Sequence, residues 1–269
     1  MKILFICPNN WLGALAGSLE RFGHELVKEN PEIILGMSIS QSKRIFAVIE
    51  KYPDCPLAIY NWDTYSYMDY NSGIWKEFGD LCRKSVDIWY PSQCTKDMTM
   101  KIYGVDKGVV IKMFVPTDWV TCAPRGDYVL LPMRFYEKDP CFDWAKRACA
   151  ELNIPLVHPN HDLPLAEYRE IMANCNMVVS PYAEASTGGM GMLEAAKCGK
   201  PVLANGSPLN GAREYMGDYA TYFDGYEDFC DKLWRMYSTS GTQEPISRTI
   251  EDMAKEINER LCLLQLQGK

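Results

Sequence analysis

Short apolar runs alternate with segments of helical periodicity along almost the whole chain, and this pattern restricts the fold more than any other feature. In the first half we expect strands at 3–7, 32–37, 57–61, 86–90 and 109–115, and helices at 12–21 and 40–51. Such alternation is typical of α/β proteins, because parallel strands need a crossover connection that is usually a helix. The expected class is therefore α/β, with doubly wound parallel sheets.

The alternation stops at 116–127, a stretch with Pro, Thr, Asp and Gly that is the best candidate for an interdomain linker. It then restarts, with strands expected at 128–132, 155–158, 177–180 and 201–204 and helices at 141–152, 165–174 and 191–198. The length of 269 residues also favours two domains. We expect one Rossmann-like domain at 1–120 and a second at 121–245.

The tail at 246–269 is a separate element. Apolar residues recur in it at helical spacing: Ile246, Ile250, Met253, Ile257, Leu261 and Leu264. This spacing gives a helix one apolar face, which has to be buried. The tail is expected to be an amphipathic helix that packs back on the N-terminal domain.

Composition and charge exclude several classes of protein. The chain is 47% hydrophobic and 12% aromatic, as in globular rather than disordered proteins. Its net charge of -7 creates no overall positive field that would attract nucleic acid or anionic lipid. No apolar run approaches the length of about 18 residues that spans a membrane, and the N-terminal run is too short for a signal peptide. Eleven scattered cysteines without a C-x-x-C pair indicate reduced thiols, so we expect a cytoplasmic protein without integral membrane contact.

The most informative stretch is 178–205, which indicates a strand, a glycine-rich loop, a helix and another strand. The loop runs through Gly188, Gly189 and Met190, and the helix opens near Gly191. Backbone N–H groups at such a helix start can approach an anion closely, and the helix dipole favours negative charge there. We therefore expect a diphosphate at this loop, with Glu194 placed to accept hydrogen bonds from ribose hydroxyls.

This stretch resembles the retaining GT-B glycosyltransferases of the group 1, family 4-like kind, which include sucrose, glycogen and lipopolysaccharide synthases. In that family the loop is followed by the motif L-E-A-x-x-x-G-x-P-V. The residues that match it in register are Leu193, Glu194, Ala195, Gly199, Pro201 and Val202. The resemblance implies two Rossmann-like domains that face a central cleft, with the donor nucleotide in the C-terminal domain.

A second match lies upstream, where family members have a strand followed by G-R-L-x-x-E-K-G. This chain has Arg134, Glu137 and Lys138 in LLPMRFYEKD, with Met133 in place of the glycine and one residue fewer between Arg and Lys. In the family the two cations neutralise the donor diphosphate. Cations that converge on a leaving diphosphate stabilise charge that grows in the transition state.

One position departs from the family pattern. The family pairs the equivalent of Glu194 with an earlier glutamate, which would fall at position 186, where this chain has Ser186. That carboxylate contacts the transferred sugar in the family, and Glu184 is the candidate replacement here. Thr187 is the remaining polar residue expected to line the donor loop.

The resemblance also implies that the N-terminal domain receives the acceptor, on loops after its first and fourth strands. The first loop offers Asn9, Asn10 and Trp11, followed by Gly13, where backbone can approach a sugar or phosphate of the donor. The second offers Asn61, Trp62, Asp63 and Tyr65, a set of aromatic platforms and hydrogen-bonding groups suited to a sugar or a base. Asp63 is the strongest polar candidate near the reacting centre, and its other interpretation is a helix cap or a turn carboxylate.

The resemblance implies a glycosyltransferase that moves a sugar from a nucleoside diphosphate sugar, a UDP-sugar, to an acceptor hydroxyl. It implies retention of configuration, no metal and no cofactor, with Arg134, Lys138 and Asp63 as the catalytic candidates. His158, His161 and Asp162 lie on a Pro-rich loop without further ligands, and no metal site is expected there. A saccharide, a small molecule and a modified DNA base all stay open as acceptor. A sugar-nucleotide epimerase or hydrolase and a non-catalytic sugar-nucleotide-binding module stay open as alternatives.

Overall fold

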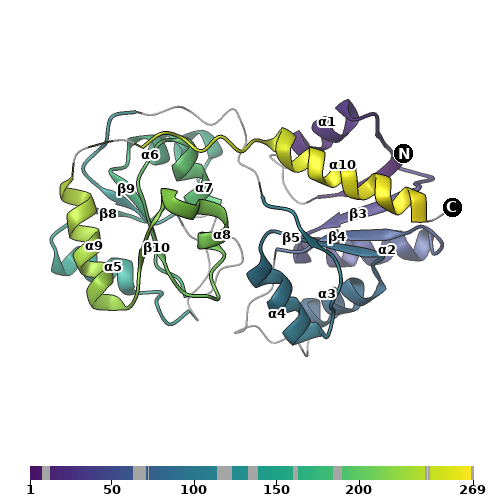
Figure 1. Cartoon of the computed structure of the whole chain (residues 1–269), viewed down its shortest axis with the longest axis horizontal. Helices are drawn as coiled ribbons and strands as arrows, with labels where there is room; N and C mark the ends of the chain where they lie inside the picture. Colours follow the sequence, from purple (N-terminus) through teal and green to yellow (C-terminus); the bar gives the residue numbers. More distant parts are fainter. Residues whose placement is uncertain are drawn as a thin grey trace. The chain divides into compact units, whose positions relative to one another are not determined.

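The computed structural model describes residues 1–7, 13–62, 71, 73–113, 123–132, 139–159, 163–183, 190–239, 241 and 243–267. The chain divides into two compact units, which are coloured along the sequence in Figure 1. The first unit comprises Met1–Pro116 together with Thr249–Lys269, and the second comprises Thr117–Arg248. Each unit is built on its own parallel sheet covered by helices, so the predicted α/β class is confirmed. Within the described residues, no helix has both the length and the hydropathy needed to span a membrane.

The first unit contains a six-stranded sheet in the order β2-β1-β3-β4-β5-β6. Its strands are β1 (Lys2–Ile6), β2 (Glu25–Leu26), β3 (Ile33–Met37), β4 (Leu57–Tyr60), β5 (Asp87–Tyr90) and β6 (Val109–Val110). All the pairings are parallel, and β3, β4 and β5 are buried along their whole length. The central strands therefore appear in the sequence as continuous apolar runs, as expected when helices cover both faces of a sheet.

Five helical segments of the first unit lie in the connections between strands: α1 (Gly13–Arg21), the 3-10 turn η1 (Ile39–Gln41), α2 (Ser42–Lys51), α3 (Gly73–Lys84) and α4 (Gln93–Tyr103). The sequence patterns did not predict α3 and α4. The ends of α4 nevertheless have ordinary signals, because the Ser92 side chain accepts a hydrogen bond from the backbone of Thr95 and Gly104 ends the helix in the left-handed conformation.

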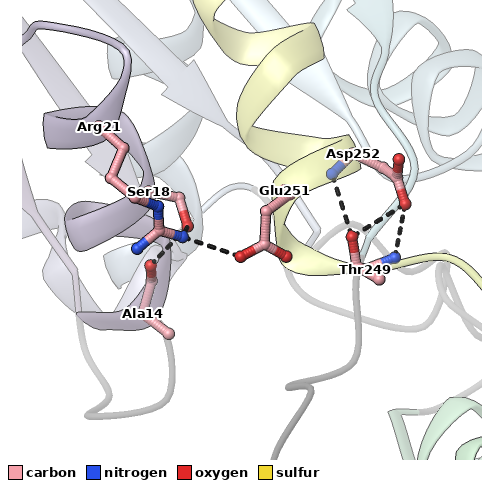
Figure 2. A network of polar contacts seen from close by, with 6 residues as sticks. All are labelled: Ala14, Ser18, Arg21, Thr249, Glu251 and Asp252. Atoms are coloured by element: carbon pink, nitrogen blue, oxygen red, sulfur yellow. Dashed lines mark hydrogen bonds and ion pairs between the residues drawn. The ribbon is translucent and has the colours of Figure 1, made fainter.

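The C-terminal helix α10 (Ile250–Gln267) packs against α1 in the first unit, as the yellow and purple helices of Figure 1 show. It begins at Ile250, whereas the apolar spacing indicated a start at Ile246. A reciprocal cap sets the start: the Asp252 carboxylate accepts from the Thr249 backbone at 2.7 Å, and the Thr249 hydroxyl accepts from the Asp252 backbone at 3.4 Å (Figure 2). Ile246 lies before this cap and donates its backbone N–H to Ala196 in the second unit.

The second unit contains a five-stranded parallel sheet in the order β11-β10-β9-β7-β8. Its strands are β7 (Val129–Leu130), β8 (Leu156–Val157), β9 (Met177–Ser180), β10 (Val202–Asn205) and β11 (Thr221–Phe223). Its helical segments are α5 (Trp144–Glu151), α6 (Leu165–Asn174), α7 (Met190–Lys197), α8 (Ala212–Met216), the 3-10 turn η2 (Gly217–Tyr219) and α9 (Tyr226–Ser238). The chain starts this sheet in the interior at β7, adds β8 on one side, and then adds β9, β10 and β11 on the other. The order therefore reverses between β7 and β9, and ligands of such sheets bind at the carboxyl ends of the strands at this reversal.

Candidate functional site

The reversal of strand order places the carboxyl ends of two strands, β7 and β9, next to each other in the second unit. β7 and β9 are adjacent and parallel, with Val129 opposite Met177 and Leu130 opposite Val178. Both strands therefore end at the same edge of the sheet. The loop after β7 carries the predicted cations, and the loop after β9 is the glycine-rich one. The described residues nearest these loops show how they are anchored.

The predicted site residues divide into two groups. Those that lie outside the described residues are Asn9, Asn10, Trp11, Asp63, Tyr65, Arg134, Lys138, Glu184, Ser186, Thr187, Gly188 and Gly189. Those that the structure describes are Gly13, Asn61, Trp62, Met190, Gly191 and Glu194. Three of the described residues lie on α7 of the second unit, and the other three lie in the first unit.

Helix α7 begins directly against the end of β7, and a glycine makes this approach possible. A Cβ atom on Gly191 would lie 2.3 Å from Cγ of Pro132, the second residue after β7. Proline cannot rotate away, so position 191 has room for no side chain. The amino terminus of α7, with the positive end of the helix dipole, therefore lies beside Pro132.

A buried carboxylate links the far end of the same loop to the glycine-rich loop. Oδ1 of Asp139 accepts hydrogen bonds from the backbone N–H of Cys141 at 2.8 Å and of Ala183 at 3.2 Å. Only 3% of Asp139 is exposed. Since Asp139 follows Lys138 and Ala183 precedes Glu184, the two loops are joined at their bases.

Two buried asparagines, Asn205 at the end of β10 and Asn210 after it, hold the chain after β9. Nδ2 of Asn205 donates to the Pro181 carbonyl at 2.8 Å, and Nδ2 of Asn210 donates to the Tyr182 carbonyl at 2.7 Å. Each asparagine also accepts a local backbone hydrogen bond, from Ser207 and Ala212 respectively. The backbone is therefore fixed up to the point where the glycine-rich loop starts.

Glu194 lies in the second turn of α7 and is half-buried. Its Oε2 accepts a hydrogen bond of 2.8 Å from the hydroxyl of Tyr168, on the neighbouring helix α6. The same hydroxyl lies 3.5 Å from the position that a Cβ on Gly191 would occupy. Tyr168, Asp139, Asn205 and Asn210 were not predicted from the sequence, because each acts through a partner far away along the chain.

The titratable groups at the bases of these loops do not form a nucleophilic or metal-binding centre. Burial raises the pKa of the Cys141 thiol to about 11, and the nearby Asp139 carboxylate adds to the rise. The thiol is therefore protonated, and unreactive as a nucleophile, near neutral pH. Among the residues that the structure describes, no group of three or more His, Cys, Asp or Glu side chains is arranged to hold a metal ion.

In the first unit, the predicted residues lie at the carboxyl ends of the strands. Asn61 follows β4 and is completely buried, and its Nδ2 donates to the Thr99 hydroxyl at 2.9 Å. Trp62 is half-buried and lies edge-on to Tyr60, with the ring centroids 5.5 Å apart. Gly13 opens α1, is exposed, and would meet no atom within 4 Å if it carried a Cβ. Asn61 thus supports this edge from inside, whereas Trp62 and Gly13 reach the surface.

The edge of the first sheet also contains an unusual backbone conformation. Ser38 follows β3 with φ of 72° and ψ of 143°, which is rare for a residue with a side chain. Its backbone N–H donates to the Tyr60 carbonyl, and its hydroxyl accepts from the Ser40 N–H at 3.3 Å. Such conformations are found most often at functional sites.

Comparison with known proteins shows which fold this is. No family model and no curated protein matches the sequence. Among solved structures, HepE from Anabaena, crystallised with UDP and glucose, is 13% identical with a TM-score of 0.62, covering 97% of this chain and 95% of its own. AviGT4, a glycosyltransferase involved in avilamycin A biosynthesis, is 13% identical with a TM-score of 0.61, and the match covers 98% of this chain and 96% of AviGT4. Sucrose-phosphate synthase from Thermosynechococcus elongatus is 9% identical with a TM-score of 0.58, and the match covers 96% of this chain and 76% of the synthase chain. The chain therefore has the GT-B fold of these structures.

Proposed function

We propose that this protein is a glycosyltransferase that transfers a sugar from a nucleoside diphosphate sugar, a UDP-sugar, to an acceptor hydroxyl. The observation that carries the proposal is the joining of two loops at the strand reversal of the second unit. Pro132 against Gly191 and Asp139 against Ala183 bring the bases of these loops together beside the amino terminus of α7. The neighbour HepE has been crystallised with UDP-glucose, which supports the donor class.

The diphosphate is proposed to bind at the amino terminus of α7. The first N–H groups of a helix have no partner within the helix, and the dipole adds positive potential there. The glycines before Met190 leave backbone accessible to phosphate oxygens. Arg134 and Lys138, on the loop that starts at Pro132, would add two positive charges. Together they would stabilise the charge that develops on the leaving diphosphate.

The ribose is proposed to bind Glu194. A carboxylate accepts hydrogen bonds at both oxygens, and the two hydroxyls of a ribose are donors with matching spacing. Glu194 lies on α7 C-terminal to the proposed diphosphate site, and its half-buried position reduces competition from water.

The reaction follows from the chemistry of the donor. The acceptor oxygen forms a bond with the anomeric carbon, the bond from that carbon to the phosphate oxygen breaks, and UDP leaves with the electron pair. The acceptor proton passes to the departing phosphate, so no further base, metal or cofactor is required. We propose retention of the anomeric configuration, in line with the motif around Glu194.

The acceptor is proposed to bind at the carboxyl edge of the first sheet. Trp62 offers an aromatic face and polar neighbours follow it in the sequence, with Asp63 as the group closest to the reacting hydroxyl. Asn9, Asn10, Trp11 and Tyr65 would complete this surface. An aromatic platform with hydrogen-bonding groups suits the apolar face and hydroxyl rim of a sugar.

A non-catalytic sugar-nucleotide-binding module is the second candidate, and Ser186 is the observation that favours it. A serine there removes the negative charge that would contact the transferred sugar. Such a module would bind UDP-sugar as tightly as an enzyme but would release no UDP when acceptors are supplied.

The cysteines are consistent with a reducing compartment. All those within the described residues are free thiols, and several are buried in the core. Exposed disulfides are the rule in small secreted domains, whereas reduced thiols persist in the cytoplasm. We propose a cytoplasmic location.

Isothermal titration calorimetry with UDP and UDP-glucose tests the donor site. Wild type is expected to bind, and Arg134→Ala, Lys138→Ala and Glu194→Ala are each expected to weaken binding by about tenfold or more, because each removes a charge-assisted hydrogen bond. Arg147→Ala is the matched control, since Arg147 forms an exposed ion pair with Glu151 on α5. Absence of binding by wild type to any nucleoside diphosphate contradicts the proposal, and UDP release on adding acceptors separates enzyme from module.

A further inference from the structure

Tyr168 connects helix α6 to the carboxylate on α7 that we assign to the nucleotide. Its hydroxyl lies 2.8 Å from Oε2 of Glu194, and both side chains are half-buried. A phenol O–H donates one hydrogen bond, and an ionised carboxylate can only accept. The direction of this hydrogen bond is therefore fixed, from Tyr168 to Glu194.

The phenol oxygen also lies close to the first turn of α7. A Cβ on Gly191 would stand 3.5 Å from the Tyr168 oxygen, an ordinary contact, and 2.3 Å from Pro132, an overlap. Gly191 is therefore needed for the approach of Pro132, and the Tyr168 oxygen lies beside the same position. This arrangement places the Tyr168 hydroxyl, the first turn of α7 and the carboxylate of Glu194 next to each other.

We propose that Tyr168 is a positioning residue that orients the Glu194 carboxylate for the ribose hydroxyls and so sets a preference for ribonucleotides over deoxyribonucleotides. This assignment rests on the proposed donor site. Tyr168 is not a catalytic residue, since it acts through Glu194 rather than on the nucleotide.

The physical basis is preorganisation. A free glutamate on a helix surface samples several rotamers, and its carboxylate rotates about the last torsion with little restriction. The hydrogen bond from Tyr168 uses one of about four acceptor positions of the carboxylate and fixes its plane. A carboxylate held in one orientation loses less conformational entropy when a ribose diol binds it.

The test compares two ligands that differ only at the ribose. Dissociation constants for UDP and 2′,3′-dideoxy-UDP are measured by calorimetry for wild type, Tyr168→Phe, Glu194→Ala and the double variant. Tyr168→Phe is expected to weaken UDP binding by about three- to tenfold, because the Glu194 side chain is then immobilised only when the ribose binds. Binding of dideoxy-UDP is expected to stay unchanged, because this ligand has no hydroxyls for Glu194 to accept from. In the double variant, loss of the Tyr168 hydroxyl should have no further effect on UDP.

Tyr128→Phe is the matched control. The Tyr128 hydroxyl donates to the Ile171 carbonyl of the same helix α6 at 2.7 Å, so its loss perturbs α6 without touching Glu194. This variant should leave the ratio of the two dissociation constants at the wild-type value. Thermal melting of all variants shows that they are folded.

Different failures have different meanings. If Tyr168→Phe weakens both ligands equally, or leaves the ratio unchanged while wild type binds UDP, the positioning role is wrong and the donor site stands. If wild type binds neither ligand, the proposed donor site is wrong, and the proposed role of Tyr168 is wrong as well.

Discussion

Arg260 on the C-terminal helix donates two hydrogen bonds to Oδ2 of Asp87 at the start of β5, from Nε at 3.0 Å and from Nη2 at 2.7 Å. Asp87 is 3% exposed, and its carboxylate also accepts from the indole of Trp89 and the backbone of Ile88. This pair joins the last helix of the chain to the sheet of the first unit. α10 is therefore part of the core of the first unit rather than an appendage.

Arg260→Ala should destabilise the first unit by about 2 to 4 kcal/mol, because it leaves a buried carboxylate without its cation. Urea denaturation measures the change in free energy of unfolding. The matched control is Arg21→Ala, which removes the ion pair between Arg21 and Glu251 of α10 (Figure 2). Both side chains are more than half exposed, so this loss should be below about 0.5 kcal/mol. Equal losses of unfolding free energy in the two variants would show that burial of Asp87 does not strengthen its ion pair with Arg260.

Stability should fall as the pH drops below about 6.5, the ordinary pKa of histidine. His24 follows α1 and is buried, with Nε2 2.9 Å from Oδ1 of Asn258 on α10, and burial lowers its pKa in the folded state. The unfolded chain therefore binds the proton more readily, and protonation favours unfolding. The contribution of His24 is complete above pH 6.5 and is lost as the pH falls toward the folded-state pKa.

His24→Gln tests this pH dependence. Glutamine keeps a donor for Asn258 and does not titrate, so the loss of unfolding free energy between pH 7.5 and pH 5.5 should be smaller in the variant than in wild type. Chemical denaturation at both pH values gives the difference. Identical losses in the two proteins would assign the acid sensitivity to other groups.

Gly191→Ala should destabilise the second unit by about 1 to 3 kcal/mol through overpacking. The added methyl would overlap Pro132, and relieving the overlap moves α7 away from β7. UDP binding should weaken with it. Gly17→Ala is the matched control, because Gly17 lies within α1 with nothing within 4 Å of its Cβ position. That change should stabilise slightly, by about 0.5 kcal/mol or more.

Asp139→Ala should release the loop after β9 from the loop after β7. The backbone N–H groups of Cys141 and Ala183 would lose their acceptor in a buried setting, at a cost of about 1 to 3 kcal/mol. Hydrogen exchange of the Ala183 amide is the direct measurement and should become faster. Asp139→Asn keeps an acceptor oxygen and should retain most of the protection, whereas equally fast exchange in both variants would mean that the charge itself is needed.

The sequence patterns located the core strands well and several helices poorly. The strands expected at 32–37, 57–61 and 177–180 agree within one residue with β3, β4 and β9, because a strand buried on both faces is a continuous apolar run. α3 and α4 were missed, although the α3 residues Ile74, Phe78 and Leu81 recur at helical spacing. The two helices meet where Gly79 of α3 leaves room for the Tyr103 ring of α4. The start of α10 was placed too early because periodicity does not register the cap at Thr249.

For the candidate site, the glycine-rich loop, Gly191 and Glu194 were predicted from the sequence, because a strand, glycines and a helix start are local signals. The structure places Gly191 and Glu194 on α7, and their role in binding stays a prediction. The anchoring residues could not. Their partners lie 26 residues away for Tyr168 and Glu194, 44 for Asp139 and Ala183, and 173 for Arg260 and Asp87. Periodicity reports which face of an element is buried but not which element covers it.

The sequence by itself therefore determined the α/β alternation and the glycine-rich composition of the segment before α7, since each depends on residues close together in the chain. Only the tertiary structure decided that β7 lies beside β9, and hence which loops share an edge. Helix packing within each unit decided that Tyr168 reaches Glu194 and that Arg260 reaches Asp87. The physical reason is that strand order is set by the sum of packing contacts across each whole unit, whereas a local pattern specifies only the elements that are packed.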